Sequence, residues 1–199
     1  MNGVAFVRIA RAVGEQLGQR HRLAHTLRVA RMAGRLARLH GVDPDRARLA
    51  ALLHDLARLW PAERLLAECA ARGMSVDAFE LENPIVLHAR IGAELARERF
   101  GVQDEGVLSA IRKHTVAGAT MTELDAIVYL ADGLEPGRRF AERADFAALA
   151  ERDIDAAMRA VLANSIDYLR GRGLAVAPQT LAAARTYGLD QPREEKRPA

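Results

Sequence analysis

Apolar residues recur along this chain at the spacing of amphipathic helices, and no run alternates as a half-buried β-strand does. Segment 20–40 shows this best: it ends before Gly41, a natural helix end, and its apolar positions are Leu23, Leu27, Ala30, Leu36 and Leu39. The pattern predicts an all-α fold.

Proline, glycine and capping residues divide the rest of the chain into further helices. Asp43-Pro44 is expected to open a helix that runs through Leu59. Thr120 and Glu123 form a predicted capping box before a helix that contains 127–131. The other predicted helices cover 4–17, 61–71, 84–100, 104–115, 145–170 with a break near 153, and a short segment after Pro178, with a less regular stretch at 73–83.

The chain has 199 residues, enough for one domain with a full core. We expect residues 20–188 to form a single-domain helical bundle and residues 1–19 to add an N-terminal helix that packs on it. Residues 189–199 are charged and contain proline, so we expect a disordered tail there.

Composition narrows the class of protein. Hydrophobic residues make up 50% and charged residues 28%, the balance of a soluble globular protein. The net charge is +3, and the arginines are scattered among acidic residues, which is typical of solvated helix faces and not of a nucleic-acid groove. One cysteine, Cys69, excludes an internal disulfide framework, and we find no signal peptide or membrane span, so a cytoplasmic protein is predicted.

Two acidic residues sit where apolar helices would bury them. Apolar residues surround His54-Asp55 on both sides, and Asp132 follows the apolar run 127–131. Because an unpaired buried carboxylate is costly, each needs a cation, a set of hydrogen bonds or a metal ion.

Three histidines, His25, His88 and His114, lie near apolar residues on three other predicted helices. Imidazoles together with carboxylates are the ligands of Zn, Fe and Mn. A lone buried histidine is more often a hydrogen-bonded core residue, and a His-Asp pair alone is a weak signal. Several such features in a chain with six histidines favour a metal site. Structural roles are expected for the remaining residues of interest: His21, His40, Trp60 and Cys69.

The order His25, His54-Asp55, Asp132 resembles the H…HD…D signature of HD-domain metal-dependent phosphohydrolases. The resemblance is closer to the YqeK branch, the symmetrical bis(5′-nucleosyl)-tetraphosphatases. It rests on segments 22–26, 53–58, 87–93, 110–115 and, most specifically, 129–138. Two positions depart from the branch, Arg58 where lysine is usual and Gly133 where tyrosine is common.

This resemblance implies a site for two divalent metal ions, with iron expected and manganese or another divalent ion as alternatives. The first ion would be held by His25, His54, Asp55 and Asp132. Asp55 would bridge to the second ion, which His88 and His114 complete, and these three residues would form the catalytic group. A hydroxide that bridges the ions would attack the polyphosphate and split diadenosine tetraphosphate into two ADP molecules.

Phosphate charge needs further donors, and Arg22, Arg58, Thr115 and Arg138 are the candidate substrate-binding residues. For each of them a surface or structural role is an equal alternative. The expected partner is a dinucleoside polyphosphate, without membrane or nucleic acid, and a homodimer is the candidate assembly.

Three other functions compete with this hypothesis. A different HD phosphohydrolase would act on nucleoside monophosphates or on alarmones. A nucleotide-binding sensor on a degenerate HD fold would be marked by lost ligands, whereas all six ligands are present here. A basic nucleic-acid binder rests only on the isoelectric point of about 9.5.

Overall fold

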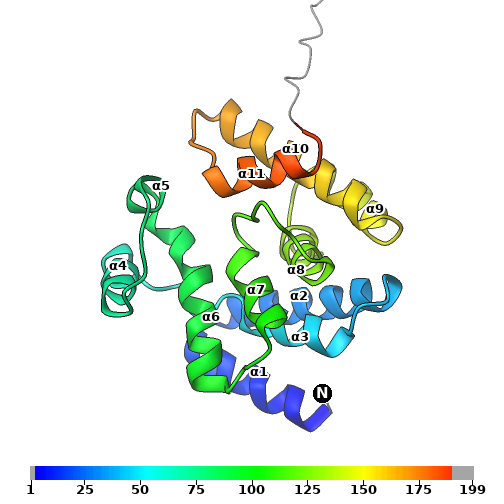
Figure 1. The fold of residues 1–199 in the computed structure, drawn as a ribbon. Coiled ribbons are helices and arrows are strands. Elements are labelled where there is room, and N and C mark those ends of the chain that lie inside the picture. Colours follow the sequence, from blue (N-terminus) through cyan, green and yellow to red (C-terminus); the bar gives the residue numbers. More distant parts are fainter. Residues whose placement is uncertain (1–2, 190–199) are drawn as a thin grey trace, which may run out of the picture.

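The computed structural model describes residues 3–189, which form eleven α-helices and one short 3₁₀ helix (Figure 1). In chain order the elements are α1 (Gly3–Leu17), α2 (Arg20–Leu39), α3 (Pro44–Leu53), α4 (Ala62–Ala71), α5 (Ala78–Glu82), the 3₁₀ helix η1 (Pro84–Val86), α6 (Leu87–Phe100), α7 (Glu105–Lys113), α8 (Glu123–Leu134), α9 (Arg143–Ala150), α10 (Ile154–Gly171) and α11 (Pro178–Thr186). No strand occurs within residues 3–189, so the predicted all-helical fold is confirmed.

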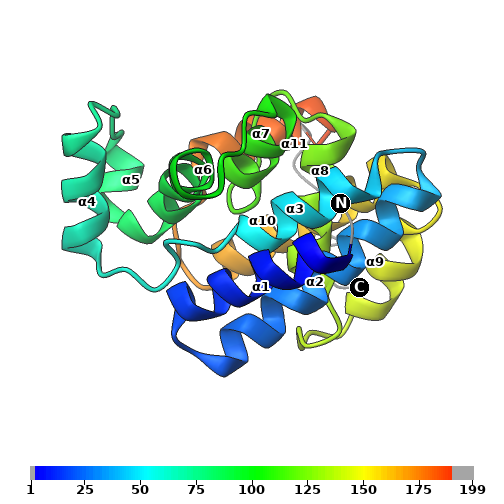
Figure 2. The ribbon, with the colours of Figure 1, turned by 90° about the horizontal axis from the view of Figure 1, so that it is seen from below.

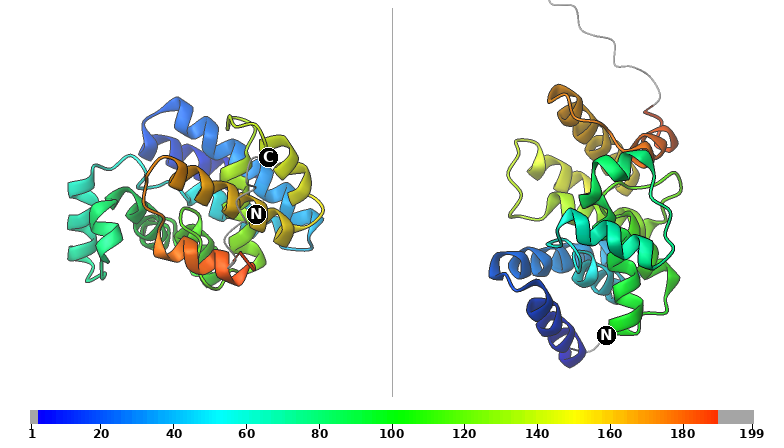
Figure 3. Two further views of the ribbon diagram at one scale, coloured as in Figure 1. Left: turned by 90° about the horizontal axis from the view of Figure 1, so that it is seen from above. Right: turned by 90° about the vertical axis from the view of Figure 1, so that its left-hand side faces the viewer.

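Four helices, α2, α3, α7 and α8, occupy the middle of the molecule. Helix α2 packs along α3 and α8, while α7 packs along α6 and α8. Seen from below, α1 lies beside α2, and α4 and α5 form the far end beyond α6 (Figure 2). Helices α9, α10 and α11 cover the side of α8 that faces away from α1 (Figures 1 and 3). The central four helices therefore have neighbours on several sides.

The core is made chiefly by the central helices. Leu52 and Leu53 at the end of α3 and Ile127 and Leu130 in α8 have no exposed surface. Burying a side chain of this size contributes roughly 1.5–3 kcal/mol. In α1, by contrast, only Val13 and Leu17 are buried, so this helix lies on the outside of the bundle. Five of the six candidate ligands thus lie on these central helices or directly after them.

The prediction of a helix from Asp43 through Leu59 was wrong at its end. Asp43 caps α3 as expected, accepting hydrogen bonds from the backbone of Asp45 and Arg46, but α3 ends at Leu53. Residues 54–59 continue as tight turns held by bonds to the carbonyl three residues back. His54 and Asp55 therefore lie just after the helix and not in its middle.

The predicted capping box was placed two residues too early. Thr122 and Asp125, not Thr120 and Glu123, cap α8 by exchanging side-chain to backbone hydrogen bonds. Asp125 is fully buried and also binds Nζ of Lys113 at 2.8 Å, which ties α7 to α8. This second contact distinguishes Asp125 from Glu123.

The observed helices differ from the predicted ones in three smaller ways. The stretch at 73–83, expected to be less regular, contains α5, which opens with a capping box of Asp77 and Glu80. Pro84 begins a 3₁₀ turn, and α6 proper starts at Leu87. Helix α9 begins at Arg143, two residues before the predicted Asp145.

None of the helices within residues 3–189 combines the length and the apolar character that a bilayer crossing requires. Most of the tail predicted to be disordered, 190–199, lies outside the described residues.

Candidate metal centre

Six side chains from five separate segments converge in the middle of the bundle. His25 lies in α2, His54 and Asp55 follow α3, His88 lies in the first turn of α6, His114 follows α7, and Asp132 lies in the last turn of α8. Three overlapping groups have potential ligand atoms within 4.8 Å of one another: His25–His54–Asp55, His54–His114–Asp132 and Asp55–His88–His114. The structure therefore brings all six predicted ligands together.

Asp55 lies between two pairs of imidazoles. Its Oδ2 atom is 3.4 Å from Nε2 of His54 and 3.8 Å from Nε2 of His25. Its Oδ1 atom is 3.4 Å from Nε2 of His88 and 3.9 Å from Nε2 of His114. Each oxygen of one carboxylate thus faces a different histidine pair.

The imidazoles are oriented by hydrogen bonds on the ring nitrogen that faces away from Asp55. In three of them Nδ1 donates to the backbone carbonyl three residues earlier: His54 to Ala51 at 2.7 Å, His88 to Ile85 at 2.5 Å and His114 to Ile111 at 2.8 Å. A carbonyl only accepts, so Nδ1 carries the proton and Nε2 of a neutral ring keeps its lone pair. This is the arrangement that second-shell partners impose on metal-binding histidines.

His25 is oriented by a carboxylate instead of a carbonyl. Its Nδ1 lies 3.1 Å from Oε1 of Glu135, which is 1% exposed. Arg28 binds the same carboxylate with two nitrogens, and the backbone N–H of Gly137 donates to it at 2.6 Å. Burial opposes ionisation of Glu135, but the hydrogen bonds from Arg28 and Gly137 outweigh it and lower its pKa to about 2.

Sequence reasoning assigned no role to Glu135 or Arg28. The argument that singled out Asp132, an acidic residue at the end of an apolar helix, applies equally to Glu135 at the C-cap of α8. Arg28 lies one turn after His25 on α2 and gave no separate signal.

Charges within the cluster favour a bound cation. Burial opposes ionisation of Asp55, but His54, His88 and His114 hold its pKa far below the ordinary range. Burial likewise opposes protonation of His54, yet the carboxylates of Asp55 and Asp132 raise its pKa to about 9. For His114, burial and the neighbouring imidazoles of His54 and His88 lower the pKa to about 3. The carboxylates of Asp55 and Asp132 therefore stabilise positive charge beside them. His114 does not supply this charge, because its lowered pKa keeps the imidazole neutral.

The helix ends add to this preference. His54 is the C-cap of α3, His114 is the C-cap of α7, and Asp132 lies in the last turn of α8. The C-terminal end of a helix carries partial negative charge, so three such ends that meet at one point favour a cation there.

The buried ligand atoms also fit a metal ion. Nε2 of His25 and Nε2 of His54 are buried, and within the described part of the chain neither makes a well-aligned hydrogen bond, although they lie 3.1 Å from Oδ1 of Asp132 and 3.4 Å from Oδ2 of Asp55, respectively. A buried polar atom without a partner costs free energy, whereas a metal ion would use both lone pairs. Donors made only of imidazole nitrogen and carboxylate oxygen suit zinc, iron and manganese.

Close packing against the turn after α3 depends on Gly92 in α6. A Cβ atom at this position would lie 3.2 Å from the carbonyl oxygen of His54. The glycine therefore lets α6, with His88, approach the turn that carries His54 and Asp55.

Two of the predicted substrate-binding arginines contact the carboxylates directly. Nη1 of Arg22 lies 3.5 Å from Oδ2 of Asp55. Arg138 binds Asp132 twice, with Nη2 on Oδ1 at 2.5 Å and Nε on the backbone oxygen at 3.0 Å.

The other two predicted substrate-binding residues also lie at the centre. Arg58 is half-buried, and burial together with the nearby charges of Arg22 and Arg138 lowers its pKa. Oγ1 of Thr115 lies 3.0 Å from Nε2 of His114 and 3.3 Å from Nε2 of His88.

Residues expected to be structural lie away from the cluster. Nε2 of His40 is 2.7 Å from the backbone oxygen of Ala150, which joins α2 to α9. His21 is exposed and Cys69 is fully buried in the core. Trp60 packs beneath the guanidinium of Arg64, 3.6 Å from the ring centre.

Comparison with known proteins connects this cluster to a family. The HD domain family matches residues 22–137, the segment that contains all six side chains. The chain belongs to the HD domain family. The predicted helical bundle of the HD type is thereby confirmed.

The sequences of relatives in this family align with most of this chain. A symmetrical bis(5′-nucleosyl)-tetraphosphatase of Bacillus subtilis is 36% identical over 84% of this chain and 89% of its own length. A protein of the same name from Halalkalibacterium halodurans is 34% identical over 86% of this chain and 91% of its own length. The crystal structure of an HD superfamily hydrolase from Clostridium acetobutylicum, described as involved in NAD metabolism, superposes with a TM-score of 0.87 at 31% identity. It covers 92% of this chain and 96% of the other.

Proposed function

We propose that this HD-domain protein is a metal-dependent hydrolase that splits diadenosine tetraphosphate and similar dinucleoside tetraphosphates into two nucleoside diphosphates. The observation that carries the proposal is the position of Asp55, whose two oxygens face two different pairs of imidazoles. The substrate comes from the relatives named symmetrical tetraphosphatases, which match over at least 84% of this chain.

Two divalent ions would divide the six ligands between them. His25, His54, Asp55 and Asp132 would hold one ion, and Asp55, His88 and His114 would hold the other. Oδ2 and Oδ1 of Asp55 already point toward these two sets, which supports Asp55 as the shared ligand. We propose iron as the metal, with manganese as the alternative, because both accept mixed imidazole and carboxylate ligands.

When bound, divalent ions supply Lewis acidity, which polarises a phosphate and lowers the pKa of a water molecule. The water oxygen forms a bond to one of the two central phosphorus atoms, and the oxygen that joins them leaves with the other half of the substrate. The water brings one oxygen and two hydrogens, so the products are two complete nucleoside diphosphates. Breaking only this central bond requires that the tetraphosphate be held symmetrically about the centre.

The chain's own residues would hold the phosphates. Arg22, Arg58 and Arg138 surround the carboxylates and offer guanidinium donors to phosphate oxygens. The hydroxyl of Thr115 lies beside His88 and His114 and is a further donor. Position 133 has room for a larger side chain, because a Cβ there would meet only Val161, at 4.0 Å.

Product analysis tests the reaction. The protein is prepared without oxygen, supplied with Fe(II) or Mn(II), and given diadenosine tetraphosphate, and the products are separated by ion exchange. ADP as the sole product is the expected result. AMP with ATP would contradict symmetrical cleavage, and no turnover with either metal would overturn the proposed function.

Four further predictions concern the location, the partners, the assembly and the domain bounds of the protein. They are a cytoplasmic location, the absence of membrane and nucleic-acid partners, assembly as a homodimer, and the domain bounds 1–19, 20–188 and 189–199.

A further inference from the structure

Helix α2 carries a row of arginines. Arg28, Arg31, Arg35 and Arg38 follow one another at intervals of three or four residues, so they share one face of the helix. They border a cavity of about 560 Å³ between α2, the end of α8 and α9. Its lining also includes Met32, Leu134, Pro136, Arg143, Ala147 and Glu151.

This arginine cavity carries strong positive charge. Among residues 3–189, five arginines and one carboxylate, that of Glu151, line it, whereas the net charge of the entire chain is only +3. Arg35 is paired with Glu151 at 2.8 Å. Arg143 donates only to the backbone oxygen of Leu134, and Arg31 and Arg38 have no ion-pair partner within residues 3–189. Several guanidinium groups therefore remain available for an anion.

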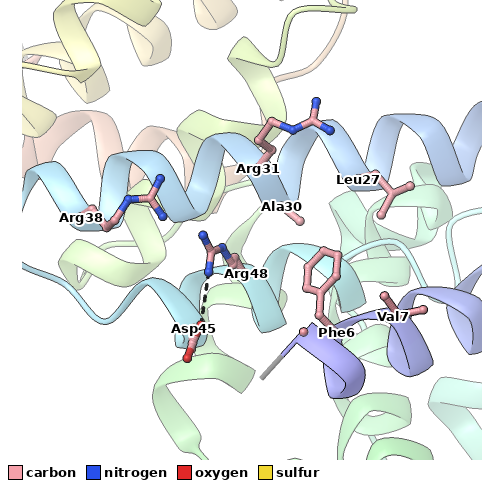
Figure 4. Close-up of a pocket in the computed structure, with 9 residues that line it drawn as sticks. Phe6, Val7, Leu27, Ala30, Arg31, Arg38, Asp45 and Arg48 are labelled. Atoms are coloured by element: carbon pink, nitrogen blue, oxygen red, sulfur yellow. Dashed lines mark hydrogen bonds and ion pairs between the residues drawn. The ribbon is translucent and has the colours of Figure 1, made fainter. Parts of the chain in front are cut away.

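A second cavity lies on the other side of α2, and its acidic residue forms an ion pair with Arg48 and not with Arg31 or Arg38. It measures about 620 Å³, and Arg31 and Arg38 border it together with Phe6 of α1 (Figure 4). On this side Asp45 forms its ion pair with Arg48 at 3.4 Å (Figure 4). Arg31 and Arg38 thus lie between two cavities, and neither has a carboxylate partner among the residues that the structure describes.

The arginine cavity also has an apolar part. Met32, Leu134, Pro136 and Ala147 line it beside the charged rim. Guanidinium groups bind phosphates with paired hydrogen bonds, and apolar surface suits the face of a nucleobase. A volume of this size is in the range of sites for small ligands.

We propose that the arginine cavity binds a nucleotide with at least two phosphate groups, at a site separate from the metal centre. Arg31, Arg38 and Arg143 hold the phosphates, and Met32 and Ala147 contact the base. None of the six candidate ligands lines the cavity.

Arg28 connects the two sites, because it lines the cavity and also binds Glu135, which orients His25. The test therefore leaves Arg28 intact and removes the two arginines without partners. Arg31→Ala/Arg38→Ala is compared with Arg8→Ala/Arg170→Ala, a control that removes two exposed charges elsewhere on the molecule.

Calorimetric titration of ADP into the Mn(II)-loaded protein measures the number of sites. We expect two sites per chain in the wild type and in the control, and binding to one of them at least tenfold weaker in Arg31→Ala/Arg38→Ala. Inorganic pyrophosphate, which has two phosphates like ADP, is titrated in parallel and should bind the cavity more weakly because it lacks a base.

ADP binding with the same number of sites and the same affinities in the wild type and in Arg31→Ala/Arg38→Ala would overturn the proposal. Equal binding of pyrophosphate and ADP at the cavity would overturn the assignment to a nucleotide. The outcome is independent of the proposed reaction, because an inactive metal centre would leave the loss of cavity binding in the variant unchanged.

Discussion

Nδ1 of His25 lies 3.1 Å from Oε1 of Glu135, and this contact joins the second turn of α2 to the end of α8. With Oε2 engaged by Arg28 and by the N–H of Gly137, the carboxylate is fixed in place. His25 is therefore oriented by an ion, whereas the other three imidazoles are oriented by backbone carbonyls. Among the four imidazoles, it is the one whose orienting contact a side-chain substitution can remove directly.

Glu135→Gln should weaken metal binding and activity by about 10- to 100-fold, because the side chain keeps its shape but loses the charge that orients His25. Metal affinity and kcat are measured together, and circular dichroism checks that the fold is retained. Glu142→Gln is the matched control, since Glu142 is exposed and makes no capping bond. Unchanged metal affinity in Glu135→Gln would show that this contact has no part in the site.

Arg58→Ala should raise KM for diadenosine tetraphosphate by about tenfold or more, because a half-buried guanidinium beside the carboxylates would be lost. Arg58→Lys should recover part of the loss, since it restores the charge without the paired donors. Arg64→Ala removes a nearby exposed arginine that stacks on Trp60 and should change KM less than twofold. Equal effects of the Arg58 and Arg64 substitutions to alanine would contradict a specific role for Arg58.

Metal binding at pH 7 should release about one proton per chain. His54 accounts for it, because the carboxylates beside it raise its pKa to about 9 in the metal-free protein, while His114, with a pKa of about 3, is already neutral. Calorimetry in two buffers with different ionisation enthalpies measures the release. Binding heats that do not depend on the buffer would contradict a protonated His54.

Asp104→Ala should destabilise the fold by about 1–2 kcal/mol at neutral pH. Asp104 caps α7 through the N–H groups of Gly106 and Val107 and also binds Arg46 with both oxygens. The bonds from Arg46 lower the pKa of Asp104, so its stabilisation is present at neutral pH and is lost as the pH falls below about 4. Urea unfolding at pH 7 and pH 3 measures this.

Asp104→Asn separates the two contributions, because asparagine still caps a helix but carries no charge. It should retain most of the stability of the wild type at pH 7. A loss as large as that of Asp104→Ala would show that the ion pair dominates instead of the cap.

Much of the fold could be predicted because proline, glycine and capping residues mark most helix ends. Where two capping signals lie close together, the sequence alone does not show which of them begins the helix. Thr120 and Thr122 each have an acidic residue three positions later, and only the buried contact between Asp125 and Lys113 selects the second. The end of α3 has no local signal, because the apolar sequence continues through Leu56 and Ala57.

The candidate ligands could be found because polar residues in apolar helices are costly and therefore stand out. The residues that orient them could not. The carbonyls of Ala51, Ile85 and Ile111 belong to the backbone and leave no trace in the sequence. Glu135 faces His25 only because α2 and α8 pack side by side.

In the proposed metal centre one carboxylate, that of Asp55, is shared by two metal ions. Elemental analysis of the Mn(II)-loaded protein, with activity measured on the same samples, tests it most directly. We predict two ions per chain in the wild type and in His40→Ala, which alters only a contact between α2 and α9. Asp55→Asn should hold fewer ions and lose turnover while remaining folded. A single ion in the active wild type, or full activity in Asp55→Asn, would contradict the shared site.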